Sequence, residues 1–286
     1  MAPPSSLAPL RRPVKVDTAL ASSSTAAPRF SVATLVTDPS QYQALRESFV
    51  SHGFEPDVAE FLFIDNTGPE QTDAYHGLNA LIHAARGQYV ILCHQDVRLL
   101  VDDRAALEAR LMDLDQRDPD WALAGNAGGL APGQLALRIT DPHGANQNTG
   151  NLPQRVMSLD ENFIVLKRSA RVGCSADLSG FHFYGADLCL NADMGGYSAW
   201  VIDFHLMHLS GGTKSRSFHD AEEQFRAKWS RALRPRWMQT TCALVRLTGS
   251  GVGQQTGRLA AKPLAGLLRR LPKTGRRGSG KTQASS

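Results

Sequence analysis

The sequence predicts an α/β fold with a mostly parallel central sheet and helices on both faces. Strand-like apolar runs alternate with segments of helical periodicity over residues 30–128, and turn residues separate the two kinds of segment. Of the 286 residues, 42% are apolar and 20% are charged, a composition typical of a globular domain with a sizeable core. Such alternation is characteristic of sheets whose strands are joined by helices.

The expected elements follow one another at short intervals. Strands are predicted at 30–36, 60–66, 89–93 and 121–128, and helices at 40–53, 73–87 and 102–114. Gly53 and Gly87 suit the ends of two helices, and Asp102 and Asp103 complement the positive end of the third. Further along, strand-like segments at 159–169 and 198–210 enclose a helical segment at 185–196. We expect this second half to close the sheet.

Both ends of the chain differ from this core in composition. Residues 1–28 are rich in Ala, Pro and Ser, and residues 249–286 are rich in Gly, Ser and basic residues. Both segments are therefore predicted to be flexible and largely disordered, and the folded domain is expected to span residues 29–248.

Charge is distributed unevenly along the chain. From Gln224 onward there are 14 Lys and Arg residues and no Asp or Glu, whereas the first 223 residues hold 17 basic and 27 acidic residues. An acidic body therefore precedes a basic tail. The tail is either a solvated segment or a contact to an anionic membrane surface, which the leucines at 264, 267, 268 and 271 favour by their helical spacing. Because the tail has few aromatic residues, we expect no nucleic-acid partner.

Cysteine usage and hydropathy indicate where the protein acts. Cys93, Cys174, Cys189 and Cys242 show no CxxC spacing, so we expect reduced cysteines in a cytoplasmic protein and neither disulfides nor a zinc site. No window has the length and apolarity of a membrane span, and the N-terminal region has no continuous apolar stretch. The sequence therefore predicts neither a transmembrane helix nor a signal peptide.

Polar residues follow three of the predicted strands at the point where each strand ends. They are Thr37 and Asp38, Asp65 and Asn66, and the run His94, Gln95 and Asp96. Ligands of open α/β sheets bind beyond the carboxyl ends of the strands, although turn formation is the alternative, above all for Asp38 before Pro39. No glycine-rich phosphate loop follows the first strand, which counts against the common dinucleotide and P-loop sites. A nucleotide would therefore need a cation held by a carboxylate.

Five segments, FSVATLVT, FLFIDNTG, GQYVILCHQDV, FHFYGADLCL and VIDFHLMHLSGG, resemble in their order the family 2 glycosyltransferases, which have the Rossmann-like GT-A fold. The sequence is most similar to a bacterial group that carries HQD where other members carry D-x-D. The similarity covers about residues 30–215. It implies transfer of a sugar from a nucleotide-sugar donor to a hydroxyl of a saccharide or lipid-linked acceptor. It also implies a role in surface polysaccharide or glycolipid synthesis, in the cytoplasm or peripherally on the inner face of the cell membrane.

The resemblance also implies roles for individual residues. Asp65 would bind the nucleotide, and Val36, Thr37 and Asn66 would line its pocket. Asp96 would hold a divalent metal, with His208 as a late metal or phosphate ligand. His94 replaces the first acid of D-x-D and, with Gln95, would contact the donor. A carboxylate with an imidazole suits Mn²⁺, whereas the carboxylate alone would suit Mg²⁺.

The general base is less clearly marked. Many members of the family carry an acid where this chain has Gly185, and the nearest acid here is Asp187. Asp187 is either the catalytic base or a carboxylate that stabilises a helix N-terminus. Tyr184 would face the acceptor or pack in the core. Asp160 and Glu161 fall where members of the family have a turn that faces the acceptor, but ordinary turn carboxylates are the favoured interpretation.

Two other functions stay open at this point. Gly185 and His94 would also suit a non-catalytic module that binds a nucleotide sugar. Asp96 and His208 would also suit a metal-dependent hydrolase.

Overall fold

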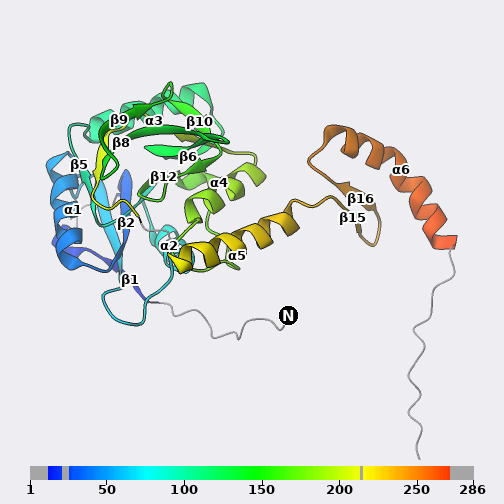
Figure 1. Ribbon diagram of the computed structural model, residues 1–286, viewed down its shortest axis with the longest axis horizontal. Helices are drawn as coiled ribbons and strands as arrows, with labels where there is room; N and C mark the ends of the chain where they lie inside the picture. The colour runs from blue at the N-terminus through cyan, green and yellow to red at the C-terminus, as the bar shows by residue number, and fades with distance from the viewer. Residues whose placement is uncertain (1–11, 21–25, 213–214, 271–286) are drawn as a thin grey trace, which may run out of the picture. The chain divides into compact units, whose positions relative to one another are not determined.

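The computed structural model describes residues 12–20, 26–212 and 215–270. The chain divides into two compact units, Met1–Phe225 and Arg226–Ser286, and each is described by itself (Figure 1). The division falls within helix α5, Arg216–Ala232, whereas the predicted domain ends at residue 248.

The first unit is built on a mixed eight-stranded sheet. In sheet order the strands are β1 (Val14–Val16), β3 (Ala59–Asp65), β2 (Phe30–Val36), β4 (Tyr89–Cys93), β12 (Phe163–Lys167), β6 (Trp121–Gly125), β13 (Ser198–Val201) and β10 (Gln154–Val156). β2 runs parallel to β3 and β4, and β13 runs parallel to β6. β12 lies antiparallel between β4 and β6, and β1 and β10 at the edges are also antiparallel to their neighbours. The α/β class is therefore confirmed, but the sheet is mixed rather than mostly parallel.

Helices cover both faces of this sheet, as predicted. Alternate side chains of a strand point to opposite faces, so β4 contributes Ile91 to one core and Val90 and Leu92 to the other. The first core is completed by α1 (Pro39–Ser51) and α3 (Arg104–Arg117), and the second by α2 (Ala74–Ala84) and α4 (Tyr184–Met194).

Aspartate side chains fix where three of these helices begin. Asp38 accepts hydrogen bonds from the backbone of Ser40 and Gln41, and Asp73 and Asp103 cap α2 and α3 in the same way. These caps satisfy backbone N–H groups that a helix leaves unpaired in its first turn. The hydroxyl of Ser40 and these backbone groups lower the pKa of Asp38. The turn interpretation of Asp38 is therefore confirmed.

A second, smaller sheet positions part of the site. It is formed by β11 (Ser158–Leu159), β7 (Ala127–Ala131), β8 (Gln134–Asp141), β14 (Leu206–His208) and β5 (Val97–Leu99), and β9 (Gly144–Thr149) pairs with β8. β14 runs antiparallel to β5, with His208 opposite Val97. Since β5 follows β4 after only three residues, this pairing brings His208 to the end of β4.

The N-terminal segment is partly ordered. Val14–Val16 form β1, which pairs antiparallel with β3, and Lys15 forms an ion pair with Asp65 at 3.1 Å. The prediction of disorder for residues 1–28 is therefore wrong at β1 and at the short 3₁₀ helix Thr18–Leu20; residues 1–11 and 21–25 lie outside the described part of the chain. Three residues carry no recognisable strand pattern, and their conformation depends on the edge that β3 offers.

The second unit contains the end of α5, a hairpin of β15 (Arg236–Gln239) with β16 (Leu244–Leu247), and helix α6 (Gly251–Arg270). Disorder was predicted from residue 249, and α6 contradicts this as far as Arg270, while 271–286 lie outside the described residues. Gly257 explains the difference, because a Cβ there would lie 2.4 Å from the Cβ of Arg246. Glycine lowers helix propensity but lets the helix approach the hairpin closely. Within the described ranges, no helix combines the length and apolarity needed to cross a bilayer.

Candidate metal and ligand site

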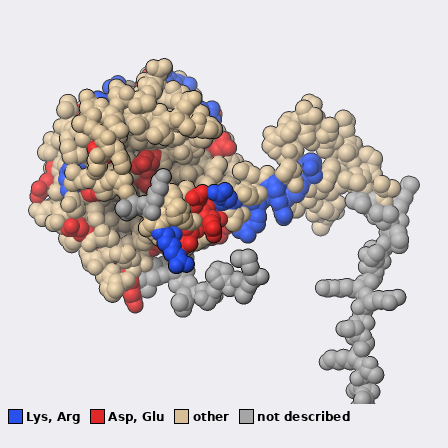
Figure 2. Space-filling view, in the orientation of Figure 1, with Lys and Arg blue, Asp and Glu red and all other residues tan. Residues whose placement is uncertain are grey.

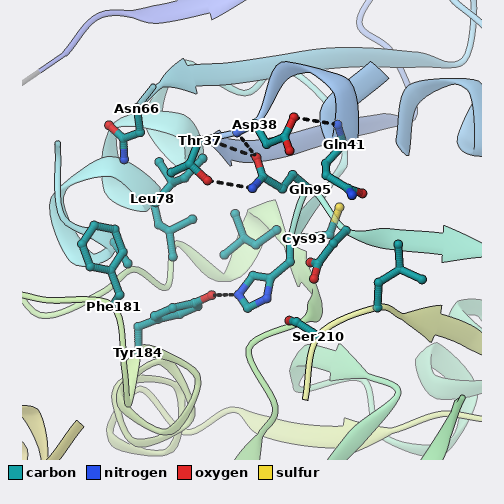
Figure 3. Close-up of a pocket in the computed structure, with 16 residues that line it drawn as sticks. Thr37, Asp38, Gln41, Asn66, Leu78, Cys93, Gln95, Phe181, Tyr184 and Ser210 are labelled. Carbon is teal, nitrogen blue, oxygen red and sulfur yellow. Dashed lines mark hydrogen bonds between the residues drawn. The ribbon is translucent and has the colours of Figure 1, made fainter. Parts of the chain in front are cut away.

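A cavity of about 520 Å³ lies at the carboxyl ends of β2 and β4 (Figure 3). Its polar lining residues are Thr37, Asp38, Gln41, Asn66, His94, Gln95, Asp96, Tyr184 and Ser210, and its apolar ones are Leu35, Ala74, Leu78, Leu92, Cys93, Phe181 and Leu209. This is the edge of the sheet at which α/β proteins bind ligands, and the volume is that of a typical small-molecule site.

Three side chains of the types that can ligate a metal ion meet beside this cavity. His94 Nδ1 lies 3.3 Å from His208 Nε2, and His208 Nε2 lies 3.4 Å from an Asp96 carboxylate oxygen. All three donor atoms lie within 4.8 Å of one another, so a single ion could contact all of them. Two imidazoles with one carboxylate form a donor set that suits Mn²⁺ and other transition metals better than Mg²⁺, which prefers oxygen ligands.

A hydrogen-bond chain connects His94 to the turn at Glu161. The Tyr184 hydroxyl lies 2.7 Å from His94 Nε2 and 3.1 Å from the backbone carbonyl of Glu161. Where the hydroxyl donates to that carbonyl, His94 Nε2 carries the imidazole proton and the Nδ1 lone pair is directed toward His208. Partners of this kind fix the tautomer of metal-binding histidines.

The protonation states also suit metal binding. Burial, together with the neighbouring His208, lowers the pKa of His94, so this imidazole stays neutral. Burial alone would raise the pKa of Asp96, but hydrogen bonds from His208 and Ser210 and the charge of His208 outweigh it and lower that pKa well below the usual value. Asp96 is therefore a carboxylate at neutral pH.

The carboxylates of Asp38 and Asp96 give the lining of the cavity a negative charge. None of the described residues that line it is Lys or Arg. Arg98 lies nearby, but its guanidinium donates to the backbone oxygen of Gln95 and to the side chain of Gln41. A diphosphate in this cavity would therefore need its charge neutralised by a bound cation.

Five predicted residues, Thr37, Asn66, His94, Gln95 and Asp96, line the cavity, and His208 contacts two of them. Two of these have structural roles. Gln95 accepts from the backbone N–H groups of Thr37 and Asp38 and donates to the Thr37 hydroxyl, which ties the ends of β2 and β4 together. Asn66 is fully buried, and its amide is paired with the backbone of Thr72. For His94 the sequence predicted a contact with the nucleotide-sugar donor. In the structure His94 is instead a member of the candidate metal cluster.

Two other predicted residues do not line the cavity. Val36 is buried in the core between the sheet, α1 and α3. The Asp65 carboxylate accepts hydrogen bonds from Thr67 and pairs with Lys15, and these contacts lower its pKa to about 2. The placement therefore does not support a nucleotide contact for either side chain. The face of the sheet on which Val36 is buried, and the pairing of Asp65 with Lys15 of β1, depend on residues that are distant in the sequence.

The structure also argues against Asp187 as the base. Its side chain is fully buried and accepts hydrogen bonds from the Ser175 backbone and hydroxyl, both at 2.7 Å, and from Asn191 at 3.0 Å. A general base must come within hydrogen-bond reach of the acceptor, and this carboxylate does not line the cavity. Asp187 instead joins the first turn of α4 to the loop at Ser175.

The sequence did not single out Phe181 or Ser210 as cavity residues. Ser210 lies 3.2 Å from His208 Nε2, and its place in the HLSGG segment was the available signal. Phe181 is 43% exposed and carries no such signal, because its position depends on the loop before α4. Tyr184, for which packing was the alternative, lines the cavity.

Comparisons with known proteins were made for sequence and for structure. No family model matches the chain. Solved structures with a similar fold include the mannosyltransferase PcManGT from Pyrobaculum calidifontis in complex with GDP-Man and Mn²⁺, at 12% identity, a TM-score of 0.47 and coverage of 72% of this chain and 65% of that one. GalNAc-T7 with UDP, GalNAc and Mn²⁺ matches at 9% identity and a TM-score of 0.40, covering 65% of this chain and 45% of that one.

A closer relative is found by sequence. The protein "ATP synthase subunits region ORF 6" of Fuscovulum blasticum is 38% identical over 226 residues, which cover 77% of this chain and 91% of the relative. Identity of this extent over most of both chains shows common ancestry and a shared fold. The chain therefore belongs to the same family as the ORF 6 protein of the Fuscovulum blasticum ATP synthase subunits region.

Proposed function

We propose that the protein is a metal-dependent glycosyltransferase that takes a nucleotide sugar as donor and a hydroxyl group as acceptor. The observation that carries this proposal is the His94, Asp96 and His208 cluster beside a cavity that no Lys or Arg lines within the described part of the chain. A site that must bind a diphosphate without Lys or Arg needs a cation, and the donor atoms for one are adjacent. The order of motifs that resembles the family 2 glycosyltransferases supports the same function.

The residues of the site divide this work between them. His94, Asp96 and His208 would hold Mn²⁺, and a Tyr184 hydroxyl that donates to the Glu161 carbonyl would keep His94 in the tautomer that this requires. A bound divalent cation would stabilise the charge of the departing nucleotide. Thr37 and the apolar residues Leu35 and Leu78 offer the remaining wall for the nucleoside. The acceptor we propose is a saccharide or lipid-linked glycan of surface polysaccharide or glycolipid synthesis.

Release of nucleotide from a donor panel tests this function. With UDP-, GDP-, CMP- and dTDP-sugars, Mn²⁺ and a lipid extract as acceptor, we expect one donor class to release its nucleotide, and EDTA to stop the release. Release that does not depend on the extract would indicate a hydrolase. Binding without release would indicate a non-catalytic module. If no donor binds or reacts, the proposed function is wrong.

We also propose that the second unit contacts an anionic membrane surface from the cytoplasmic side. Helix α6 turns its small residues inward, since Gly257 is buried and Gly253 and Ala261 are partly buried. Its large apolar residues Val252 and Leu259 are 72% and 79% exposed. At about 100° per residue they lie on one side of the helix, roughly 140° or more from Gly257. The packing within this unit therefore leaves the apolar side of α6 uncovered.

Charge favours an anionic lipid surface as the partner of this face. No acidic residue occurs after Glu223, and the charged side chains visible on the second unit in Figure 2 are all basic. Arg258 and Lys262 are exposed on α6 beside the apolar side chains. Such a helix lies in the membrane interface, and each basic residue near an anionic surface contributes about 1 kcal/mol.

The three buried cysteines of the first unit are unpaired, which supports a reducing compartment.

Introducing acid on this face is expected to weaken membrane binding. The double variant Val252→Asp/Leu259→Asp should lower co-sedimentation with phosphatidylcholine–phosphatidylglycerol vesicles by about 10-fold or more, because two apolar side chains are lost and two negative charges are added. Val101→Asp/Leu135→Asp, at exposed apolar positions of the first unit, is the matched control and should bind as the wild type does. Unchanged binding of the α6 variant, or equal wild-type binding to neutral vesicles, would contradict the proposal.

A further inference from the structure

A second cavity, of about 740 Å³, lies at the opposite end of β4 from the candidate metal site. Gln88, directly before β4, and Leu166 of β12 line it, together with residues from the last turns of α2 and from the segment that follows β12. Arg168 and Arg171 are among these lining residues, and none of the described ones is Asp or Glu. This cavity is therefore basic, whereas the lining of the first one is acidic.

Arg168 and Arg171 have no partner within the described part of the chain. Neither forms an ion pair or a side-chain hydrogen bond with a residue that the structure describes. The other described Lys and Arg side chains of the first unit, Arg155 apart, all have such a bond. The two arginines are one 3₁₀ turn apart, which brings their side chains to the same side. Their like charges repel each other, and an anion between them would remove this repulsion.

Contacts of the surrounding backbone hold the two arginines in place. The side-chain amide of Asn79 accepts from the backbone N–H of Cys174 and donates to its carbonyl, both at 2.8 Å, and Asn191 donates to the carbonyl of Gly173 at 3.0 Å. A Cβ at Gly173 would lie 2.8 Å from Asn79 Oδ1, so glycine permits this close approach. Arg171 is held at φ 53°, a left-handed conformation that destabilises any residue with a Cβ. The surrounding structure therefore fixes an arrangement that the arginines themselves do not stabilise.

The helix end beside the cavity favours carboxylates over phosphate groups. Ile82 and His83, from the last turn of α2, line the cavity, and this end of a helix carries the partial negative charge of its dipole. Phosphate sites use the opposite end of a helix, where backbone N–H groups point at the anion. A guanidinium binds a carboxylate through two parallel hydrogen bonds and needs no help from a helix. The cavity thus suits singly charged carboxylates.

Apolar side chains adjoin the arginines. Ile82, Leu166 and Val172 line the same cavity, so a ligand that fills it must present apolar surface next to its carboxylates. A short polypeptide segment with Asp or Glu on either side of an aliphatic residue has this chemistry. Residues 1–223 hold 27 acidic and 17 basic residues. The negative charge of the first unit would therefore repel such a segment elsewhere and leave this cavity as the place where it is attracted.

We propose that this cavity binds an acidic segment of a partner protein. Carboxylates of the segment pair with Arg168 and Arg171, and an aliphatic side chain between them lies against Ile82. The cavity is at the other end of β4 from the candidate metal cluster and needs no cation, so the interaction is independent of the proposed function.

A fluorescein-labelled peptide, Glu-Leu-Glu-Glu-Leu-Glu, is the probe, and its fluorescence anisotropy with the whole chain in EDTA measures the affinity. Arg168→Gln/Arg171→Gln should lower this affinity by about 10-fold or more, because two charge-assisted pairs are lost, and should leave the thermal midpoint close to that of the wild type. Arg110→Gln/Arg117→Gln removes the same charge from exposed positions of the first unit. This matched control should bind as the wild type does, and Gln-Leu-Gln-Gln-Leu-Gln should not bind.

Four results would overturn the proposal. The first is equal affinity of the wild type and Arg168→Gln/Arg171→Gln, or no binding by either. The second is a similar loss in Arg258→Gln/Lys262→Gln, which would place the peptide on the basic second unit. The third is equal binding of Glu-Ser-Glu-Glu-Ser-Glu, which would show that the apolar lining has no part. The fourth is displacement of the peptide by an equimolar amount of citrate, which would indicate a site for a small carboxylic acid.

Discussion

Replacing Asp96 by Asn is expected to lower the affinity for Mn²⁺ by at least about 100-fold. The substitution removes the only carboxylate of the donor set and leaves the two imidazoles of His94 and His208. Changes in groups that merely orient metal ligands already cost about 10–100-fold, so loss of a charged ligand should cost more. Titration followed by the electron paramagnetic resonance signal of free Mn²⁺ measures this affinity directly.

Asp38→Asn is the matched control for this prediction. Asp38 lines the same cavity but caps α1 and takes no part in the cluster. Its replacement should cost about 1 kcal/mol of stability at most and leave Mn²⁺ affinity unchanged. Equal affinities of wild type and Asp96→Asn would show that the ion binds elsewhere or not at all.

Replacing Asp187 by Asn is expected to destabilise the first unit by about 3 kcal/mol. The carboxylate accepts three hydrogen bonds in a fully buried position, and an amide would place an N–H group against one of these donors. Chemical denaturation followed by circular dichroism measures the change. Asp193→Asn, at an exposed position of the same helix, should have almost no effect.

The same variant distinguishes the two roles considered for Asp187. A structural carboxylate predicts lower stability, with any loss of activity following the loss of folded protein. A catalytic base predicts normal stability and no transfer. The second outcome would restore Asp187 as the base and contradict its placement away from the cavity.

The sequence was most informative where function depends on groups at the ends of strands. The apolar run of β4 stops abruptly at His94, and this alone places the HQD residues at the ligand-binding edge of the sheet. The HLSGG segment added His208. That His94 would join Asp96 and His208 in the candidate metal cluster could not be predicted, because it depends on the pairing of β14 with β5 and on the contact with Tyr184.

Predictions failed where the decisive partner is distant in the sequence. Asp65 is engaged by Lys15 from β1, and Asp187 by Ser175 from a separate loop. β12 appeared as a strand, but its antiparallel direction is set by its neighbours β4 and β6. Helix α6 contains glycines, which lower the stability of an isolated helix. Packing of Gly257 against Arg246 of the hairpin offsets this loss of stability.

The contact that Glu161 makes with α4 shows the same dependence on distant partners. In the sequence it is one of two adjacent acids in a turn, and nothing nearby distinguishes it from Asp160. Its contact with α4 arises only when β11 and β12 bring the turn to the helix N-terminus.

Calorimetric titration of the whole chain with UDP, GDP, CMP and dTDP, with Mn²⁺ and again with EDTA, tests the central claim most directly. Among the described residues no Lys or Arg lines the cavity, so the proposed function requires a cation at His94, Asp96 and His208 to bind the anion. We therefore predict that at least one nucleotide binds in Mn²⁺, that none binds in EDTA, and that Asp96→Asn abolishes the binding. Binding of equal strength in EDTA, or no binding under either condition, would contradict the claim.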